Sequence, residues 1–256
     1  MKVAILCGGT GTRLREETEF RPKPMVEIGG RPILWHIMRH YARFGHEEFV
    51  LCLGYKGDLI RSWIVNFQTM NSDVRVHIGS QRVEYLDSLR DEQSWLVTLA
   101  DTGQLTPTGG RLVHARRYLE GATFLATYGD GLSNVDLGRL IEFHRRHGKI
   151  ATVTGVRPLT RFGELEVRDG MARRFREKPQ LEDGWVNGGF FVFEPEVFKY
   201  LDENATLERE PLERLTADGQ LAVYEHEGFW AAMDTYRETQ QLNEEWASGR
   251  PGWLEP

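Results

Sequence analysis

The chain has few cysteines, no long apolar runs and no excess of positive charge, and each shortage excludes a class of protein. Its 256 residues include two cysteines, Cys7 and Cys52, which form neither a C-x-x-C motif nor a disulfide framework. A reducing cytoplasm is therefore the expected compartment. No stretch resembles a membrane-spanning helix or a secretory leader. The formal net charge of −6 argues against nonspecific binding to nucleic acid or to anionic membranes.

Two familiar phosphate-binding motifs are also missing from the Gly-rich stretch at residues 7–17, CGGTGTRLREE. A P-loop would end in Gly-Lys-Ser/Thr, and the dinucleotide fingerprint would have a third glycine where Leu14 stands. Three glycines between a strand and a helix can still expose backbone N–H groups to an anion. A tight turn that binds nothing is the alternative at this point.

Apolar segments of strand length alternate with segments of helical periodicity through the first half of the chain. Expected strands cover residues 3–6, 49–53, 96–99, 124–128 and 150–156, and expected helices cover 32–44, 58–67, 110–119 and 137–147. This alternation predicts βαβ units, and hence a Rossmann-like α/β fold with a mostly parallel sheet flanked by helices on both faces.

The second half of the chain is richer in expected strands. A hairpin is predicted over 164–176, further strands over 190–193 and 221–225, and a closing helix over 235–246. Because no linker or repeat separates the halves, one domain with a β-rich elaboration is expected. Residues 78–95 are predicted to be a long polar connector, either a solvated loop or part of an interface.

Three charged residues stand in motifs that suit a phosphate and a metal ion. Lys23 lies between Pro22 and Pro24, which are expected to keep the backbone extended and to limit where its side chain points. Asp130 closes an expected strand, at the sheet edge where open α/β folds bind ligands. Asp234 precedes the last expected helix, where an ordinary N-cap is the alternative. Because Mg²⁺ takes one or two carboxylates and completes its shell with phosphate and water, the two aspartates form a candidate magnesium site.

Taken together, these motifs make the chain similar to the sugar-1-phosphate nucleotidyltransferases, and within them to the glucose-1-phosphate cytidylyltransferase branch. The resemblance runs almost end to end. It is carried by GGTGTRL (8–14), PKPMVEIGG (22–30), PILWHIM (32–38), LGYKG (53–57), DTG (101–103), TGGRL (108–112), YGDG (128–131), RFG (161–163), EKP (177–179), NGGFF (187–191) and MDT (233–235). The WHIM, DTG, GGR and MDT stretches point to the cytidylyl branch.

The resemblance implies the fold of the nucleotide-diphospho-sugar transferases and a reaction. CMP would pass from CTP to α-D-glucose 1-phosphate, giving CDP-glucose and pyrophosphate, with Mg²⁺ as cofactor. The single domain over 1–256 would have a nucleotide-binding part at about 1–156 and a β-rich, sugar-phosphate-binding part at about 157–256. The resemblance also implies a homotrimer or homohexamer with active sites near the subunit contacts. Residues 78–95 are predicted to take part in these contacts.

Roles for individual residues follow from the same resemblance. Arg13 and Lys23 are expected to be catalytic, with Arg13 on the β- and γ-phosphates and Lys23 beside the α-phosphate. Asp130 and Asp234 are expected to hold Mg²⁺. The expected nucleotide contacts are Leu6, Gly8, Gly9, Thr10, Gly11, Thr12, Arg13, Lys23, Thr102, Arg111 and Asp130. The expected contacts of the sugar phosphate are Gly163, Glu177, Lys178, Asn187 and Gly188.

One departure from the family pattern leaves the acceptor open. Glu164 stands where relatives tend to have a small residue, so a cytidylyltransferase acting on another phosphorylated acceptor is an alternative. A catalytically silent regulatory subunit is a second alternative. Such a subunit would be expected to have lost one of the four charges of Arg13, Lys23, Asp130 and Asp234, and the chain keeps all of them.

Overall fold

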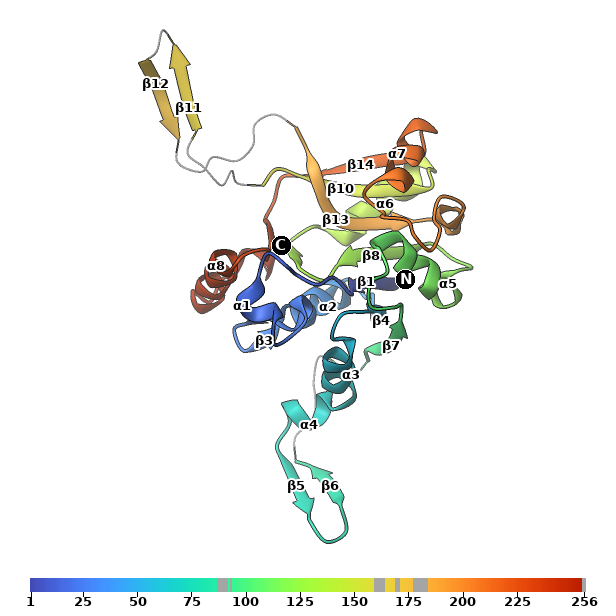
Figure 1. The fold of residues 1–256 in the computed structure, drawn as a ribbon, viewed down its shortest axis with the longest axis vertical. Coiled ribbons are helices and arrows are strands. Elements are labelled where there is room, and N and C mark those ends of the chain that lie inside the picture. Colours follow the sequence, from blue (N-terminus) through green and yellow to red (C-terminus); the bar gives the residue numbers. More distant parts are fainter. Residues whose placement is uncertain (87–91, 93, 159–163, 169–170, 177–183, 255–256) are drawn as a thin grey trace.

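A seven-stranded sheet with the order β14-β10-β13-β8-β1-β4-β7 forms the centre of the molecule (Figure 1). The computed structural model describes residues 1–86, 92, 94–158, 164–168, 171–176 and 184–254. The strands are β1 Lys2–Cys7, β4 Glu48–Leu53, β7 Leu96–Asp101, β8 Phe124–Tyr128, β10 Ala151–Val156, β13 Val186–Phe193 and β14 Leu221–His226. Strand β13 is antiparallel to β8 and β10, and the other neighbours are parallel. The predicted mostly parallel α/β fold is confirmed.

Helices cover both faces of this sheet, as the alternation predicted. They are α1 Arg15–Thr18, α2 Ile33–Arg43, α3 Gly57–Val65, α4 Phe67–Asn71, α5 Thr108–Leu119, α6 Leu137–His147, α7 Glu210–Ala217 and α8 Tyr236–Ala247, with 3-10 turns η1 Lys23–Met25, η2 Pro195–Lys199 and η3 Gly252–Leu254. Successive side chains of β1 point to opposite faces, so Val3 and Ile5 pack with α2 whereas Ala4 and Leu6 pack with α5. Burial on both faces explains why residues 3–7 of the strand are all apolar.

The helix expected over 58–67 is interrupted in the structure. It ends at Val65, and α4 begins at Phe67. Between them, the Asn66 side-chain amide donates a hydrogen bond to the carbonyl of Ser62 at 2.8 Å. Asparagine competes in this way with the backbone bonds that would continue a helix, so the prediction of one unbroken helix was wrong.

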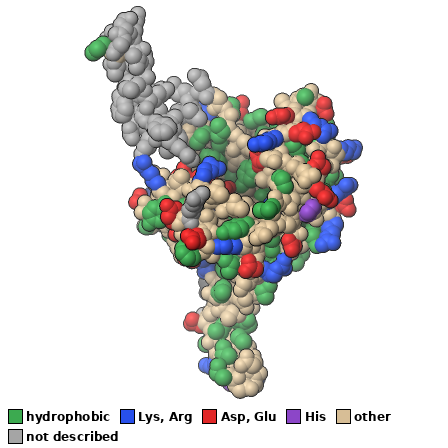
Figure 2. All heavy atoms as spheres, viewed as in Figure 1, with side chains coloured by type: hydrophobic (Ala, Val, Ile, Leu, Met, Phe, Trp, Pro, Cys, Tyr) green, Lys and Arg blue, Asp and Glu red, His purple; other side chains and the backbone are tan. Residues whose placement is uncertain are grey.

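The hairpin arm, residues 72–86, replaces part of the connector expected over 78–95. Strands β5 (Val74–His77) and β6 (Arg82–Tyr85) pair antiparallel and project from the body beyond α4 (Figure 1). Hydrophobic side chains lie along the arm in Figure 2. They are Val76, Ile78, Val83, Tyr85 and Leu86, which are between 41% and 77% exposed. Two four-residue strands among charged residues give too short an alternation to predict from sequence.

Smaller strand pairs complete the fold. They are β2 Glu27–Ile28 with β3 Arg31–Pro32, β9 Gly131–Ser133 with β15 Trp230–Ala232, and β11 Glu164–Arg168 with β12 Met171–Arg176. The hairpin predicted over 164–176 is confirmed. The β9–β15 pair matters most for the site, because it brings the segment after β8 beside the segment before α8. No helix in the described ranges is long and apolar enough to span a bilayer.

Candidate active site

A cavity of about 410 Å³ opens at the carboxyl ends of β1 and β8. Open α/β sheets bind their ligands at this edge. Ten of the predicted ligand residues line it: Leu6, Gly8, Gly9, Gly11, Thr12, Arg13, Lys23, Arg111, Asp130 and Asp234. The structure thus brings together residues that lie in five separate stretches of the chain.

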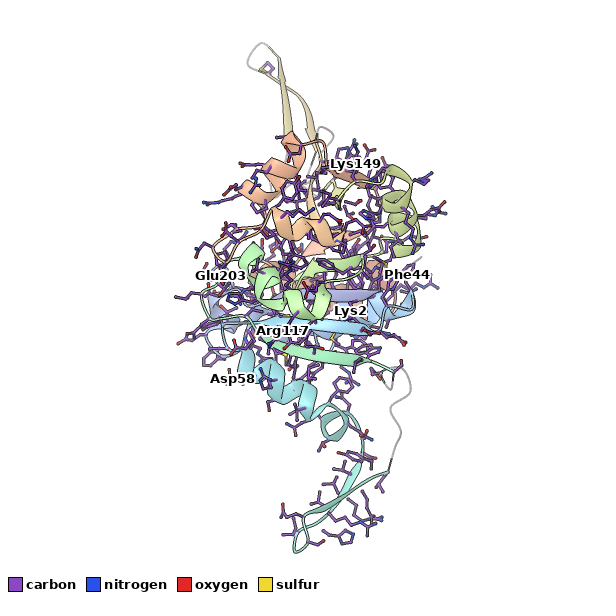
Figure 3. All side chains as sticks on the ribbon, turned by 90° about the vertical axis from the view of Figure 1, so that its right-hand side faces the viewer. Lys2, Phe44, Asp58, Arg117, Lys149 and Glu203 are labelled. Carbon is purple, nitrogen blue, oxygen red and sulfur yellow. The ribbon has the colours of Figure 1, made fainter. Side chains whose placement is uncertain are left out.

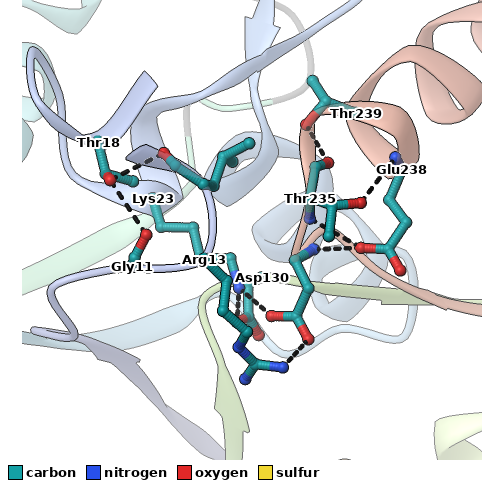
Figure 4. A network of polar contacts seen from close by, with 10 residues as sticks. Gly11, Arg13, Thr18, Lys23, Asp130, Thr235, Glu238 and Thr239 are labelled. Carbon is teal, nitrogen blue, oxygen red and sulfur yellow. Dashed lines mark hydrogen bonds and ion pairs between the residues drawn. The ribbon is translucent and has the colours of Figure 1, made fainter. Parts of the chain in front are cut away.

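Four of the charged side chains that line the cavity contact one another and are called the charge cluster below: Arg13, Lys23, Asp130 and Asp234. Figure 4 shows the network of polar contacts to which they belong. The Lys23 ammonium donates to Asp130 Oδ2 at 2.7 Å and to Asp234 Oδ1 at 2.6 Å. Arg13 Nη1 donates to Asp234 Oδ2 at 2.7 Å. The formal charges of the cluster cancel, so each cation is already paired in the protein without substrate.

The N-cap alternative for Asp234 is excluded by the residue that follows it. Thr235 is the N-cap of α8, and its hydroxyl accepts from the Glu238 backbone N–H at 3.3 Å. The Glu238 carboxylate accepts in turn from the backbone N–H groups of Thr235 and Asp234, both at 2.8 Å. This capping box leaves the Asp234 carboxylate to the two cations.

Lys23 is placed by a turn rather than by extended backbone. Pro22 is extended, but Lys23 begins the single 3-10 turn η1 with Pro24 inside it. The prediction of extended chain on both sides was therefore wrong, because a proline also fits the first turn of a helix, where its missing N–H is not needed. Burial works to lower the pKa of the Lys23 ammonium, but Asp130 and Asp234 outweigh it and raise this pKa above its usual value. Lys23 is thus held as a cation.

The carboxylate pair fits the predicted Mg²⁺ in its chemistry. Both carboxylates already converge on one cation, the Lys23 ammonium, and both are oxygen donors of the kind that Mg²⁺ prefers. The described residues contain no group of three or more His, Cys, Asp or Glu side chains that could enclose a metal by themselves. The site would therefore need phosphate oxygens and water to complete the coordination.

Arg111 lines the same cavity, and its set of hydrogen bonds is called the arginine clamp below. Its guanidinium is buried and donates to the carbonyl oxygens of Gly8, Leu53, Gly103 and Gln104 and to the Thr102 hydroxyl, at 2.7 to 3.4 Å. These acceptors lie at or just after the last residues of β1, β4 and β7. A Cβ atom at Gly8 would stand 2.0 Å from Arg111 Cζ, and one at Gly54 would stand 2.3 Å from Nη1. Glycine on both sides gives the guanidinium its space.

The hydrogen bonds of the arginine clamp involve two of the predicted nucleotide contacts, Arg111 and Thr102. Arg111 does line the cavity, but both of its terminal nitrogens bond to the protein itself. Thr102 is fully buried, donates to Leu53 O at 2.7 Å and stands behind Arg111 rather than on the cavity wall. Thr10 lines a separate hollow beside Tyr55. Nucleotide contacts by these three residues stay predictions.

Part of the cavity wall escaped the sequence reasoning. Thr106, Thr108 and Thr206 line it together with Tyr128. The loop that carries Thr206 lies against the start of α5, where Gly110 N donates to Ala205 O at 3.0 Å. Thr106 and Thr108 precede or open a helix next to a glycine pair, which was a usable signal. Nothing local marked Thr206, which reaches the site from about a hundred residues away.

The predicted sugar-phosphate residues are only partly within the described structure. Asn187 is exposed at the start of β13, and its amide donates to the Tyr128 hydroxyl at 3.1 Å. Gly188 is buried, and its carbonyl accepts from Trp230 Nε1 at 2.8 Å. Gly163, Glu177 and Lys178 lie outside the described residues.

The chain is similar in sequence and in fold to known proteins. The profile of the family "Nucleotidyl transferase" matches residues 2–235. The glucose-1-phosphate cytidylyltransferase of Salmonella typhimurium is 46% identical over 255 residues, covering 99% of this chain and 98% of the relative. The enzyme of the same name from Salmonella typhi is also 46% identical, with the same coverage. In fold, the solved structure of UDP-glucose pyrophosphorylase complexed with UDP-glucose matches with a TM-score of 0.69 and 14% identity, over 97% of this chain and 99% of that one.

Proposed function

The chain belongs to the nucleotidyl transferase family, and from that premise we propose that it transfers CMP from CTP to α-D-glucose 1-phosphate, releasing CDP-glucose and pyrophosphate. The observation that carries the proposal is the charge cluster facing a Gly-rich loop in one cavity. The names of the two relatives at 46% identity support the choice of CTP and glucose 1-phosphate.

In this reaction an oxygen of the sugar phosphate attacks the α-phosphorus of CTP. A new P–O bond forms as the bond to the bridging oxygen of the β-phosphate breaks, and pyrophosphate leaves with the electron pair. The main obstacle is electrostatic, since two like unit charges 4 Å apart repel by about 4 kcal/mol at an effective dielectric near 20. The protein has to supply position and positive charge.

The described residues can supply both. Backbone N–H groups of the loop Gly8–Thr12 would bind the triphosphate, and the Arg13 fork would hold the β- and γ-phosphates as pyrophosphate leaves. Lys23 would stabilise the charge that develops on the α-phosphate. Both cations are paired with carboxylates in the free protein. We therefore propose that they exchange these carboxylates for phosphate oxygens when CTP binds.

Asp130 and Asp234 would hold Mg²⁺, which when bound neutralises phosphate oxygens around the reacting phosphorus. We further propose that the acceptor is held by Gly163, Glu177, Lys178, Asn187 and Gly188. On this view the nucleotide part, about 1–156, and the β-rich part, about 157–256, each hold one substrate. With both cysteines free and buried, the reducing cytoplasm is the proposed location.

The test is pyrophosphate release by purified protein with Mg²⁺. CTP, UTP and dTTP are each paired with glucose 1-phosphate and with other sugar 1-phosphates. We expect turnover with CTP and glucose 1-phosphate, reduced roughly 10²- to 10³-fold in Lys23→Ala because a preorganised charge is lost. Lys149→Ala is the control, because Lys149 is exposed and lies away from the cavity (Figure 3). Turnover of CTP with a different acceptor alone would contradict the glucose 1-phosphate assignment and favour the Glu164 alternative.

We also propose a homotrimer or homohexamer in which the hairpin arm contacts a second copy of the chain. Five exposed hydrophobic side chains on one projecting hairpin support this proposal, since such patches usually mark interaction sites. Sedimentation velocity of Ile78→Asp/Val83→Asp tests it, with Leu105→Asp as a control on another exposed apolar residue. Smaller particles are expected from the arm variant alone. An unchanged sedimentation coefficient would exclude the arm from the interface.

A further inference from the structure

The NGG stretch (187–189) at the start of β13 contacts Tyr128 of β8, a residue to which the proposed reaction assigns no role. Strand β13 runs antiparallel to β8, so its first residues reach the edge where the parallel strands end. The paired register ends at Phe191 opposite Ala126, and Gly189 lies next to Tyr128 just beyond it. A Cβ atom at Gly189 would stand 2.4 Å from Tyr128 Cδ2. Glycine at this position lets the Tyr128 ring approach the backbone of β13 closely.

The Tyr128 hydroxyl makes a hydrogen bond to the start of β13, where it accepts from Asn187 Nδ2 at 3.1 Å. Glu208 is close enough for its charge to help raise the pKa of the Tyr128 phenol. Glu208 Oε2 itself accepts from the Thr108 hydroxyl at 2.7 Å, and Thr108 lines the cavity.

The direction of the hydrogen bond between Asn187 and Tyr128 is determined. An amide nitrogen can only donate, so the Tyr128 oxygen accepts. Burial, with Glu208 next in importance, raises the pKa of the Tyr128 phenol, so the phenol keeps its hydrogen. On its other side, Asn187 Oδ1 accepts from the Gly189 N–H at 2.9 Å. Two independent contacts therefore agree on which way the Asn187 amide points.

We propose that Tyr128 is a positioning residue for the acceptor substrate: its hydroxyl accepts from the Asn187 amide and fixes this amide so that one N–H and one oxygen lone pair face the sugar 1-phosphate. This inference rests on the proposed function, in which Asn187 contacts the acceptor. Tyr128 itself also lines the nucleotide cavity through its ring. Its hydroxyl should therefore matter for the sugar phosphate and its ring for the nucleotide.

Tyr128→Phe separates these two parts, because it removes the hydroxyl and keeps the ring against Gly189. We expect the KM for glucose 1-phosphate to rise about tenfold, with the KM for CTP changed less than about twofold and kcat nearly constant. The control is Tyr200→Phe, which removes a hydroxyl that donates to Asp218 at 2.8 Å away from the cavity. Equal changes in both KM values would mean a general structural role and would overturn the proposal.

A double-mutant cycle tests whether the hydroxyl acts through Asn187. In an Asn187→Ala background, Tyr128→Phe should cause no further rise in the KM for the sugar phosphate, because the amide to be oriented is gone. Additive effects of the two substitutions would contradict the relay.

A measurement without substrate keeps the relay separate from the reaction. The NMR resonances of the Asn187 carboxamide, assigned by their loss in Asn187→Ala, should shift in Tyr128→Phe and stay in place in Tyr200→Phe. Unmoved resonances in Tyr128→Phe would refute the relay. Absence of turnover by the unaltered protein would instead refute the proposed function.

Discussion

Arg111 and Arg13 present the same guanidinium group to one cavity, yet the Arg111 residue is 3% exposed and the Arg13 side chain 69%. Arg111 bonds to oxygens at the ends of three different strands, whereas Arg13 bonds to the single carboxylate of Asp234. The arginine clamp is thus part of the folded framework. The charge cluster is a set of paired side chains, for which we propose an exchange of partners when a ligand binds.

This difference suggests a division of labour in the site. Breaking the clamp would remove the hydrogen bonds that join the ends of β1, β4 and β7 through one buried side chain, and the cost would appear in the free energy of unfolding. Breaking an exposed pair such as Arg13 with Asp234 costs little stability, since water and salt screen it. The cost should appear in the reaction instead. Three predictions, in order of decreasing effect, test the comparison.

His36 and His40 are buried in the folded framework, as Arg111 is, but their charge can change at acid pH. Burial, with lesser contributions from neighbouring arginines, lowers the pKa of His36 and of His40 to about 4 from the usual value of 6.5. Between these two pH values the unfolded chain binds more protons than the folded one, so stability is lost as pH falls from 6.5 to 4. Each histidine then costs about 3 kcal/mol by pH 4.

Urea unfolding at a series of pH values measures this loss. His40→Phe should remove about half of it, since the ring lies among Tyr41, Phe44 and Phe190 and a phenyl group carries no proton there. His114→Gln is the control, because His114 is exposed on α5. An acid loss of stability unchanged by His40→Phe would show that the buried histidines are not its source.

Arg111→Lys should break the clamp. One ammonium group cannot reach acceptors on three strands, so the free energy of unfolding should fall by roughly 3 kcal/mol and the melting temperature by roughly 8 °C. Arg117→Lys, on the same helix but exposed (Figure 3), should leave both unchanged. Differential scanning calorimetry gives the comparison. A melting temperature unaffected by Arg111→Lys would mean that the clamp contributes no stability.

Arg13→Lys should have the opposite signature. Its charge is kept but its planar fork is lost, so kcat for pyrophosphate release should fall about tenfold while the melting temperature moves less than about 2 °C. Arg139→Lys, an exposed arginine paired with Asp136 at 3.5 Å, is the matched control. If Arg13→Lys lowered the melting temperature as much as Arg111→Lys, the charge cluster would contribute to stability as the arginine clamp does, and the comparison would fail.

Much of the site could be predicted from short sequence motifs. The Gly-rich loop, Lys23 beside its prolines and Asp130 at a strand end are local signals, and all of them line the cavity. Thr206 and Glu208 gave no such signal, because their loop is irregular and reaches the site from another part of the chain. The Gly109–Gly110 pair lets that loop approach the start of α5 closely, since a Cβ atom at Gly110 would stand 2.1 Å from Glu203 O. This reason for glycine depends on the loop and is not visible in the local sequence.

Local sequence patterns were enough to specify the alternation of strands and helices, since apolar periodicity and turn residues act over a few neighbours. The sequence also shows which charged side chains are available. Which of these charges meet depends on the fold. Lys23 contacts Asp130 and Asp234, 107 and 211 positions away, because the β9–β15 pair brings the two aspartates to one sheet edge. Strand order and direction follow from how all the apolar faces pack together, and no local pattern contains that information.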